Sequence, residues 1–251
     1  MTTPPPAEAG RKNLRAFHEA LGAEPAAAGA RRSLGWPHRL WWPEPPTALN
    51  PQALAALTED RQLSLWDPPE ALGAQLDQAG WSLVLEQTAM HRALDEVPRA
   101  GPEPRPELDI QRPAPAELGA WTKAMSAAFG YEVPVDVGAT LLGHPDAQLL
   151  GAWLRLGDGE TVSAGTAVAF RTGDVVGIHQ VGVTPAARRR GIARALMIRL
   201  LEDLAAGRLW PEARIRLITL QASAAGRPLY EALGFTPHGV VKTYAARSTF
   251  S

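Results

Sequence analysis

The sequence predicts an α/β fold of the α+β kind, with helices flanking a mixed central sheet, together with a smaller N-terminal domain. Three observations predict it. Apolar strands alternate with helices through the second half of the chain, and a proline-rich seam separates that half from the first. Of the 251 residues, 45% are apolar and 20% are charged, an ordinary balance for a globular protein with room for two modest domains.

Proline marks the predicted domain boundary. Residues 97–106 read VPRAGPEPRP, and four prolines and a glycine exclude a helix or an internal strand there. The predicted organisation is therefore disorder over 1–10, a smaller domain at 11–97, a linker at 98–106 and a larger domain at 107–251.

Periodicity predicts the elements of the larger domain. Leu196, Leu200 and Leu204 recur at helical spacing, and Gly157-Asp158-Gly159 marks a turn between two strands. In chain order we expect a short edge strand at 107–112, a helix at 116–129, strands at 147–156, 161–171 and 174–183, a helix at 191–206, a strand at 214–221, a helix at 224–233 and a strand at 240–246.

An internal repeat appears at an offset of 154 residues. Ser64-Leu65-Trp66 aligns with Ile218-Thr219-Leu220, and residues 76–81 align with 230–235, so both stretches read strand, helix, glycine-aromatic, strand. The match is either a chance likeness of two such units or the remnant of a duplication over about 30–97. A duplication predicts a strand at 64–66, a helix at 69–79 and a strand at 83–90.

Composition excludes several classes of function. A formal net charge of −1 gives no reason to expect binding to nucleic acid or to an anionic membrane, and no apolar run approaches the ~20 residues of a membrane span. The absence of cysteine excludes disulfides, thiolate metal sites and a cysteine nucleophile. The N-terminal residues lack the basic and apolar regions of a signal peptide, so we expect a cytoplasmic protein.

The most informative segment is 177–196, GIHQVGVTPAARRRGIARAL. A strand is expected to end at Val183, and a turn leads through three arginines and Gly191 into a helix. Free N–H groups and the dipole at a helix start attract phosphate, glycine permits close approach, and arginine donates charge-assisted hydrogen bonds. The segment predicts either a phosphate cradle or simply a basic helix start. Neither a P-loop nor a dinucleotide-binding glycine motif is present.

Two motifs in the right order resemble those of the GNAT superfamily of N-acetyltransferases. Residues 181–193 resemble its acyl-CoA motif, Q/R-x-x-G-x-G/A, and residues 223–235 resemble N-x-x-A-x-x-L-Y-x-x-x-G-F, with Ser223 in place of the usual asparagine. The resemblance covers about 140 residues. It implies a GNAT fold for 107–251, a degenerate GNAT-like first half, acetyl-CoA as co-substrate and no metal.

The resemblance also implies roles for individual residues. Backbone groups of Val181, Gly182 and Val183 would pair with the pantetheine arm, and the Val181 N–H would serve as oxyanion donor. Tyr230 would protonate the departing thiolate, and Ser223 would contact CoA. The pyrophosphate would be held by Arg188, Arg189, Arg190, Gly191, Ile192 and Ala193.

The general base is less clearly marked. Gly177 stands where many relatives carry a glutamate, and His179, two residues before Val181, is expected on the same face of the strand. The resemblance implies that His179 is the base, while a histidine satisfied inside a half-buried strand is the plainer interpretation. Weaker candidates are Glu132, Asp136 and His144.

The resulting prediction is an enzyme that transfers acetyl from acetyl-CoA to a primary amine, on a small molecule or a peptide, by direct attack in a ternary complex. The alternative is a non-catalytic acyl-CoA-binding regulatory protein. In the first half, Leu76 stands at the position of Tyr230, so no second active site is expected. Trp36, Trp41 and Trp42 there would line an acceptor pocket, form a homodimer contact or build a small core.

Overall fold

The chain folds into two compact units whose sequences interleave. A computed structural model describes residues 5–44, 46–49, 52, 56–57, 61–94, 107–157 and 159–247. Unit 1 contains residues 92–220, and unit 2 contains residues 5–91 together with 221–251. The predicted linker at 98–106 lies outside the described residues.

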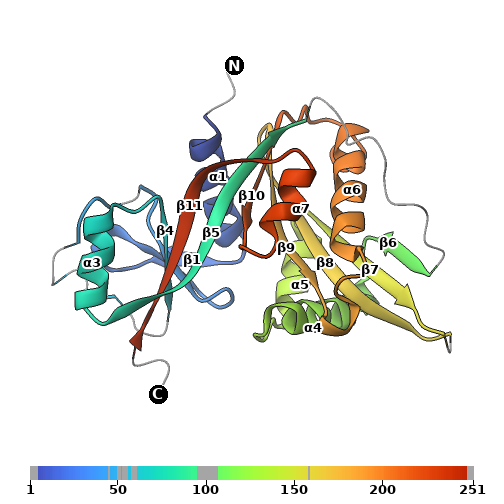
Figure 1. The fold of residues 1–251 in the computed structure, drawn as a ribbon, viewed down its shortest axis with the longest axis horizontal. Helices are drawn as coiled ribbons and strands as arrows, with labels where there is room; N and C mark the ends of the chain where they lie inside the picture. The colour runs from blue at the N-terminus through green and yellow to red at the C-terminus, as the bar shows by residue number, and fades with distance from the viewer. Residues whose placement is uncertain are drawn as a thin grey trace. The chain divides into compact units, whose positions relative to one another are not determined.

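The sheet of unit 1 has the strand order β10-β9-β8-β7-β6 (Figure 1). Its strands are β6 (Leu108–Gln111), β7 (Ala147–Arg155), β8 (Thr161–Thr172), β9 (Val175–Val183) and β10 (Leu217–Ala222). Neighbours from β6 to β9 are antiparallel, and β10 runs parallel to β9. A chain reversal closed by the Leu156 N–H donating to Glu160 O joins β7 to β8, at the predicted turn.

Helices cover both faces of this sheet. One face carries α4 (Leu118–Phe129), against which α5 (Val135–Gly143) packs, and the other carries α6 (Ile192–Ala205). The predicted leucine stripe anchors α6, since Leu196, Leu200 and Leu204 are all buried. Gly130, at φ +77°, ends α4 in the left-handed conformation that glycine adopts without strain.

The sheet of unit 2 has the order β1-β2-β3-β4-β11-β5. Its helices are α1 (Pro6–Ala20), α3 (Glu70–Gln78) and α7 (Arg227–Ala232). Its strands are β1 (Ala23–Pro25), β2 (Arg31–Ser33), β3 (Arg39–Trp41), β4 (Gln62–Trp66), β5 (Trp81–Ala93) and β11 (Thr236–Ala246). Single 3₁₀ turns occur at Ala27–Gly29 in unit 2 and at Pro115–Glu117 and Pro185–Ala187 in unit 1.

The C-terminal strand β11 lies between two strands of the first half of the chain. It pairs antiparallel with β4 over Val241–Tyr244 and with β5 along almost its whole length (Figure 1). This pairing explains why the compact units do not follow the predicted boundary between 11–97 and 107–251. Strand β11 completes a sheet that begins with the first half of the chain.

The elements predicted by the internal repeat are confirmed. Adding 154 to β4, α3 and β5 gives the positions of β10, α7 and β11 within a few residues. Gly80 and Gly234 have matching φ values of +85° and +83°, and each donates its N–H to the residue three positions earlier, Asp77 and Glu231. The strand directions match as well. In the first half β1, β2 and β3 are antiparallel neighbours and β4 is parallel to β3, and in the second half β7, β8 and β9 are antiparallel neighbours and β10 is parallel to β9.

One expectation about local structure was wrong, and one helix was not predicted. Disorder was predicted over 1–10, but α1 begins at Pro6, because proline at the first helical position fits a helix start. Helix α5 was not predicted, since its sequence VDVGATLLG contains glycine and β-branched residues that weaken the helical pattern. None of the helices in the described residues combines the length and apolar character of a membrane span.

Candidate functional site

A β-bulge interrupts the pairing between β8 and β9. His179 pairs with Val168 and Gly182 pairs with Thr166, so two residues of β9, Gln180 and Val181, lie opposite one residue of β8. Gln180 has φ +53°, a left-handed conformation that costs free energy for a residue with a side chain. The Thr166 hydroxyl donates to Gln180 O at 2.9 Å and holds the bulge in place.

Beyond the bulge, β9 pairs on one side only. The parallel pairing of β10 with β9 covers Val175–Ile178, whereas the pairing of β8 continues to Val183. Among the described residues of unit 1, the edge of β9 from Gln180 to Val183 therefore has no strand partner on the β10 side. This edge leaves backbone groups that an extended ligand can pair with.

Two glycines let helices approach the sheet at this point. A Cβ on Gly182 would lie 2.8 Å from Ala128 Cβ and from the Phe129 ring, at the end of α4. A Cβ on Gly165 would lie 2.9 Å from Gly182 O and 3.2 Å from Ile192 Cγ2 and Leu196 Cδ1 of α6. Because Gly165 and Gly182 hold adjacent register positions, α4 and α6 clamp the bulged region from opposite faces.

The start of α6 is exposed and basic. Gly191 caps the helix at φ +73° without a side-chain hydrogen bond, and the first turn contains no acidic residue. The first intrahelical bond runs from Ala195 N–H to Gly191 O, so the earlier amides in the turn are not used within the helix. Residues 188–191 are exposed, and all but the glycine are arginines.

Arg188 braces this loop. Its guanidinium donates to Val183 O at 3.3 Å and to Ala128 O at 3.0 Å, which ties the loop to the end of β9 and to the end of α4. Arg189 has φ +60°, so the turn before α6 carries a second left-handed residue. The predicted cradle residues of unit 1 are therefore brought together with the unpaired segment of β9.

His179 is placed differently from the prediction. The bulge breaks the two-residue alternation, so the expectation that His179 shares a face with Val181 is wrong. By register it shares the face of Val168 and Gly182, the face covered by α4. Its side chain is 6% exposed, and burial lowers its pKa to about 3. The imidazole is therefore neutral at physiological pH but shielded from solvent.

The weaker base candidates have structural roles or lie in solvent. The Asp136 carboxylate accepts the Val137 N–H at 2.9 Å in the first turn of α5. His144 Nδ1 accepts the Asp146 N–H at 3.1 Å in the turn before β7, and its ring packs on Phe170. Glu132 is exposed in the loop between α4 and α5.

An aromatic pair next to the bulge was missed by the sequence reasoning. Phe129 and Tyr131 are stacked with centroids 5.8 Å apart and are 37% and 43% exposed. The Tyr131 hydroxyl lies 3.4 Å from Gln180 Oε1. Two aromatic residues at the end of a predicted helix could have been noted as a possible contact surface, but nothing in the sequence relates them to Gln180.

The second motif belongs to unit 2. Tyr230, in α7, is 8% exposed and packs its ring edge-on against Phe235. Burial raises its pKa to about 12, so the phenol keeps its proton at neutral pH. Ser223 Oγ accepts the Gly226 N–H at 3.2 Å, so this serine organises the turn that leads into α7.

Comparison with known proteins identifies the domain. Residues 149–237 match the family described as acetyltransferase (GNAT) domain. None of the curated proteins matches the sequence. Residues 149–237 therefore resemble a GNAT acetyltransferase domain.

Solved structures share the fold over nearly the whole chain. A GCN5-related N-acetyltransferase from Kribbella flavida is 17% identical with a TM-score of 0.65, and the match covers 98% of this chain and 96% of that one. One from Sphaerobacter thermophilus is 18% identical with a TM-score of 0.58, covering 96% and 93%. A tandem GNAT protein from the clavulanic acid biosynthesis pathway is 14% identical with a TM-score of 0.57, covering 86% and 77%.

The buried His179 makes folding dependent on pH. Because its folded pKa of about 3 lies below the ordinary value of 6.5, its contribution to stability is present above pH 6.5 and is lost as the pH falls toward 3. The slope is up to about 1.4 kcal/mol per pH unit in that window. His179→Gln should therefore reduce the difference in free energy of unfolding between pH 7 and pH 4.5, measured by urea unfolding.

Val168→Ala provides the matched control, since Val168 pairs with His179 and carries no titratable group. It should lower stability by a similar amount at both pH values. The imidazole signal of His179 should also fail to titrate between pH 8 and pH 4.5 in a proton NMR experiment. A titration midpoint close to the ordinary histidine value would contradict the burial argument.

Proposed function

We propose that the chain is a cytoplasmic N-acetyltransferase that transfers acetyl from acetyl-CoA to a primary amine by direct attack in a ternary complex. The observation that carries the proposal is the unpaired edge of β9, which lies beside the exposed, arginine-rich start of α6 in unit 1. An extended chain ending in a phosphate group has chemistry complementary to both parts.

The residues present fit the CoA moiety. Backbone groups of Val181, Gly182 and Val183 would pair with the amide-containing pantetheine arm as an added strand does. The amides from Arg189 to Ala193 would hold the pyrophosphate, with the positive end of the α6 dipole and the neighbouring guanidinium groups favouring its charge. Arg188, already bound to two carbonyls, would fix the loop rather than serve chiefly as a phosphate ligand.

The transfer itself needs an oxyanion donor and two proton movements. The amine nitrogen attacks the thioester carbonyl carbon, negative charge gathers on the carbonyl oxygen, and the C–S bond breaks as the amide forms. A preorganised backbone N–H is the most effective stabiliser of that oxygen, and we propose the Val181 N–H for this role. The bulge supports it, because it removes Val181 from regular pairing with β8.

The proton of the attacking amine must be lost before or during attack, because an ammonium has no lone pair. His179 is a poor direct acceptor, since it is buried under α4 and its pKa is lowered to about 3. We therefore propose that water carries this proton away, with the exposed Glu132 as the alternative acceptor. Tyr230 would donate to the departing thiolate, and it retains its proton across the physiological range.

A non-catalytic acyl-CoA-binding regulatory protein is the second candidate. The same β9 edge and α6 cradle would serve such a protein, so these features do not separate the two functions. The proposal of an enzyme rests on the additional presence of Tyr230, a protonated hydroxyl on the second motif. Burial raises its pKa to about 12, so the phenol keeps its proton at neutral pH and is available as a donor.

Gly191→Glu should weaken CoA binding about tenfold or more, measured by calorimetry. The added carboxylate would compete with phosphate for the same amides. A glutamate also strains the backbone at the left-handed φ of +73°, so the control has to introduce the same strain. Gly207→Glu is the matched control, since Gly207 has a similar φ of +65° and follows the opposite end of α6. Equal CoA affinities of the two folded variants would contradict the proposal that the start of α6 binds the pyrophosphate.

Tyr230→Phe should lower kcat about a hundredfold with little change in acetyl-CoA affinity, because only the late proton donor is lost. The ring that packs on Phe235 is retained. Tyr244→Phe, at another buried tyrosine of unit 2, should leave kcat unchanged. Full turnover by Tyr230→Phe would show that solvent or another group protonates the thiolate.

A further inference from the structure

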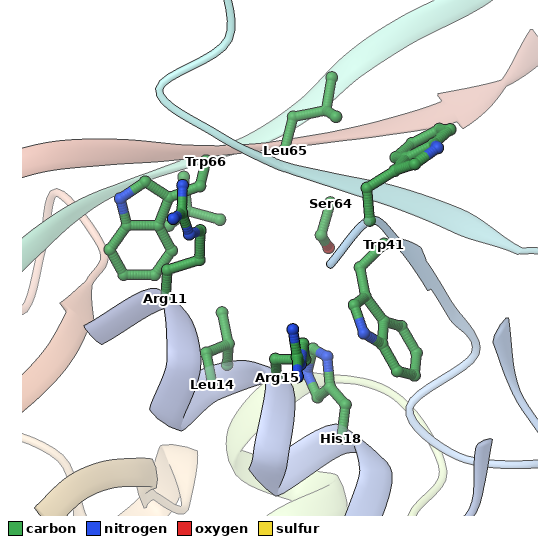
Figure 2. Close-up of a pocket in the computed structure, with 10 residues that line it drawn as sticks. Arg11, Leu14, Arg15, His18, Trp41, Ser64, Leu65 and Trp66 are labelled. Atoms are coloured by element: carbon green, nitrogen blue, oxygen red, sulfur yellow. The ribbon is translucent and has the colours of Figure 1, made fainter. Parts of the chain in front are cut away.

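The cavity of unit 2 is too small for an organic amine. It has a volume of about 40 Å³ and lies between α1 and β4, with Trp41 of β3 at one end (Figure 2). One water needs about 10–15 Å³ on this measure, so the space holds roughly three waters. Arg11 and Arg15 beside it are already paired with Glu44 and Glu19. A surface for the acceptor of the proposed transfer is found instead in unit 1.

The exposed apolar side chains of unit 1 gather in one short segment. Among its described residues, the large apolar side chains that reach solvent are Phe129, Tyr131 and Val135. Single exposed apolar residues are ordinary at a protein surface, whereas several together next to a candidate site mark a contact surface. The segment follows the end of α4, where that helix closes on the bulge of β9.

Hydrogen bonds hold this segment in a defined turn. The Gly130 N–H donates to Ser126 O at 2.8 Å, and the Val133 N–H donates to Ser126 Oγ at 2.9 Å. The same hydroxyl donates to Thr122 O at 2.9 Å. Val133 is buried, so its side chain anchors the far end of the turn. The aromatic residues on either side of Gly130 are therefore carried on a fixed turn, and a preorganised surface loses less entropy when a ligand binds.

The rings of the aromatic pair, Phe129 and Tyr131, are nearly parallel. Their centroids are 5.8 Å apart and the interplanar angle is 21°. Both side chains are exposed, so part of each ring faces solvent. A further ring packs favourably on such a pair, in an offset or edge-on contact, by about 0.5–1.5 kcal/mol beyond the area that it buries. The pair therefore suits a flat apolar group better than a charged or strongly polar one.

The aromatic pair contacts both residues that flank Val181. A Cβ on Gly182 would lie 2.8 Å from the Phe129 ring, and the Tyr131 hydroxyl donates to Gln180 Oε1 at 3.4 Å. Val181, between these two residues, carries the backbone N–H proposed as the oxyanion donor. An acceptor whose ring rests on the pair therefore needs only a short linker to bring its amine to the thioester carbonyl.

A carboxylate stands next to the aromatic pair. Glu132 directly follows Tyr131 and is exposed. Its negative charge favours the approach of an amine in its ammonium form, before that amine loses its proton.

We propose that Phe129 and Tyr131 bind the acceptor, and that the acceptor is a small primary amine with an aromatic ring on a short linker. This inference rests on the proposed acetyl transfer, because it names the substrate class of that same site. The ring of the acceptor packs on the aromatic pair while its amine reaches the carbonyl at Val181. The products are the N-acetyl derivative of the amine and the free CoA thiol.

2-Phenylethylamine and 2-cyclohexylethylamine are the matched probes, because they share the amine, the linker and the ring size and differ in the flatness of the ring. With saturating acetyl-CoA and concentrations expressed as free base, thiol release should give a KM for the aromatic amine that is lower by about threefold or more. Equal KM values, or a higher kcat/KM with n-butylamine than with 2-phenylethylamine, would overturn the inference and leave the acetyl transfer standing.

Tyr131→Leu and Tyr131→Phe separate the ring from the hydroxyl, since both variants lose the hydrogen bond to Gln180 and only the second keeps an aromatic face. Tyr131→Leu should abolish the preference for 2-phenylethylamine, and the effect should fall mainly on KM. Tyr131→Phe should retain the preference. Acetyl-CoA affinity, measured by calorimetry, reports that both variants are folded. Identical behaviour of the two variants would contradict a role for the ring.

Binding without turnover separates this inference from the acetyl transfer. With CoA in place of acetyl-CoA no acetyl group can move, and saturation-transfer NMR should show the ring of 2-phenylethylamine bound to the full chain, more weakly in Tyr131→Leu than in Tyr131→Phe. Such binding without thiol release from acetyl-CoA would contradict the acetyl transfer and retain the aromatic pair as an amine site. Acetylation of other amines without binding of 2-phenylethylamine would overturn the aromatic pair and retain the transfer.

Discussion

The bulge at Gln180 and Val181 is the constraint on which the candidate site depends. A strand with regular pairing on both sides would have no backbone groups left for a ligand. The left-handed Gln180 is held by the Thr166 hydroxyl, and the absence of side chains at Gly165 and Gly182 lets α6 and α4 close on both faces. The parallel partner β10 pairs with β9 only as far as Ile178, which leaves one edge of the rest of β9 without a strand partner. The arginine-rich start of α6 follows shortly after this edge in the sequence.

Unit 2 depends on an equally long-range interaction. Strand β11, from the C-terminal end of the chain, lies between β4 and β5 and pairs with both. The matching glycines at 80 and 234 and the matching strand order make duplication the simplest account of the two halves. The first half lacks the arginine-rich turn, because the short β3 is followed by Trp42 and Pro43. Its Trp41 instead lines the cavity beside α1.

Much of this architecture could be predicted from the sequence, for physical reasons that differ between elements. The leucines at 196, 200 and 204 form one buried face of a helix, and the two glycine-aromatic pairs mark helix ends. Local sequence patterns were therefore enough to predict these elements. The bulge could not be predicted, because Gln180 is not a residue that favours positive φ and Thr166 is remote in sequence. The side of the sheet on which His179 lies was therefore predicted wrongly. The placement of β11 depends on pairing across more than a hundred residues, which local patterns do not encode.

The most direct measurement of the central claim is release of the free CoA thiol from acetyl-CoA in the presence of a panel of primary amines. The panel should include small aliphatic and aromatic amines, amino acids and peptide N-termini, each compared with its N-acetylated form as a control that lacks the nucleophile. An acetyltransferase predicts thiol release above background with at least one free amine and with none of the blocked ones, and an acetylated product in equal amount. Tight acetyl-CoA binding without amine-dependent release across the panel would contradict this account and favour a binding protein.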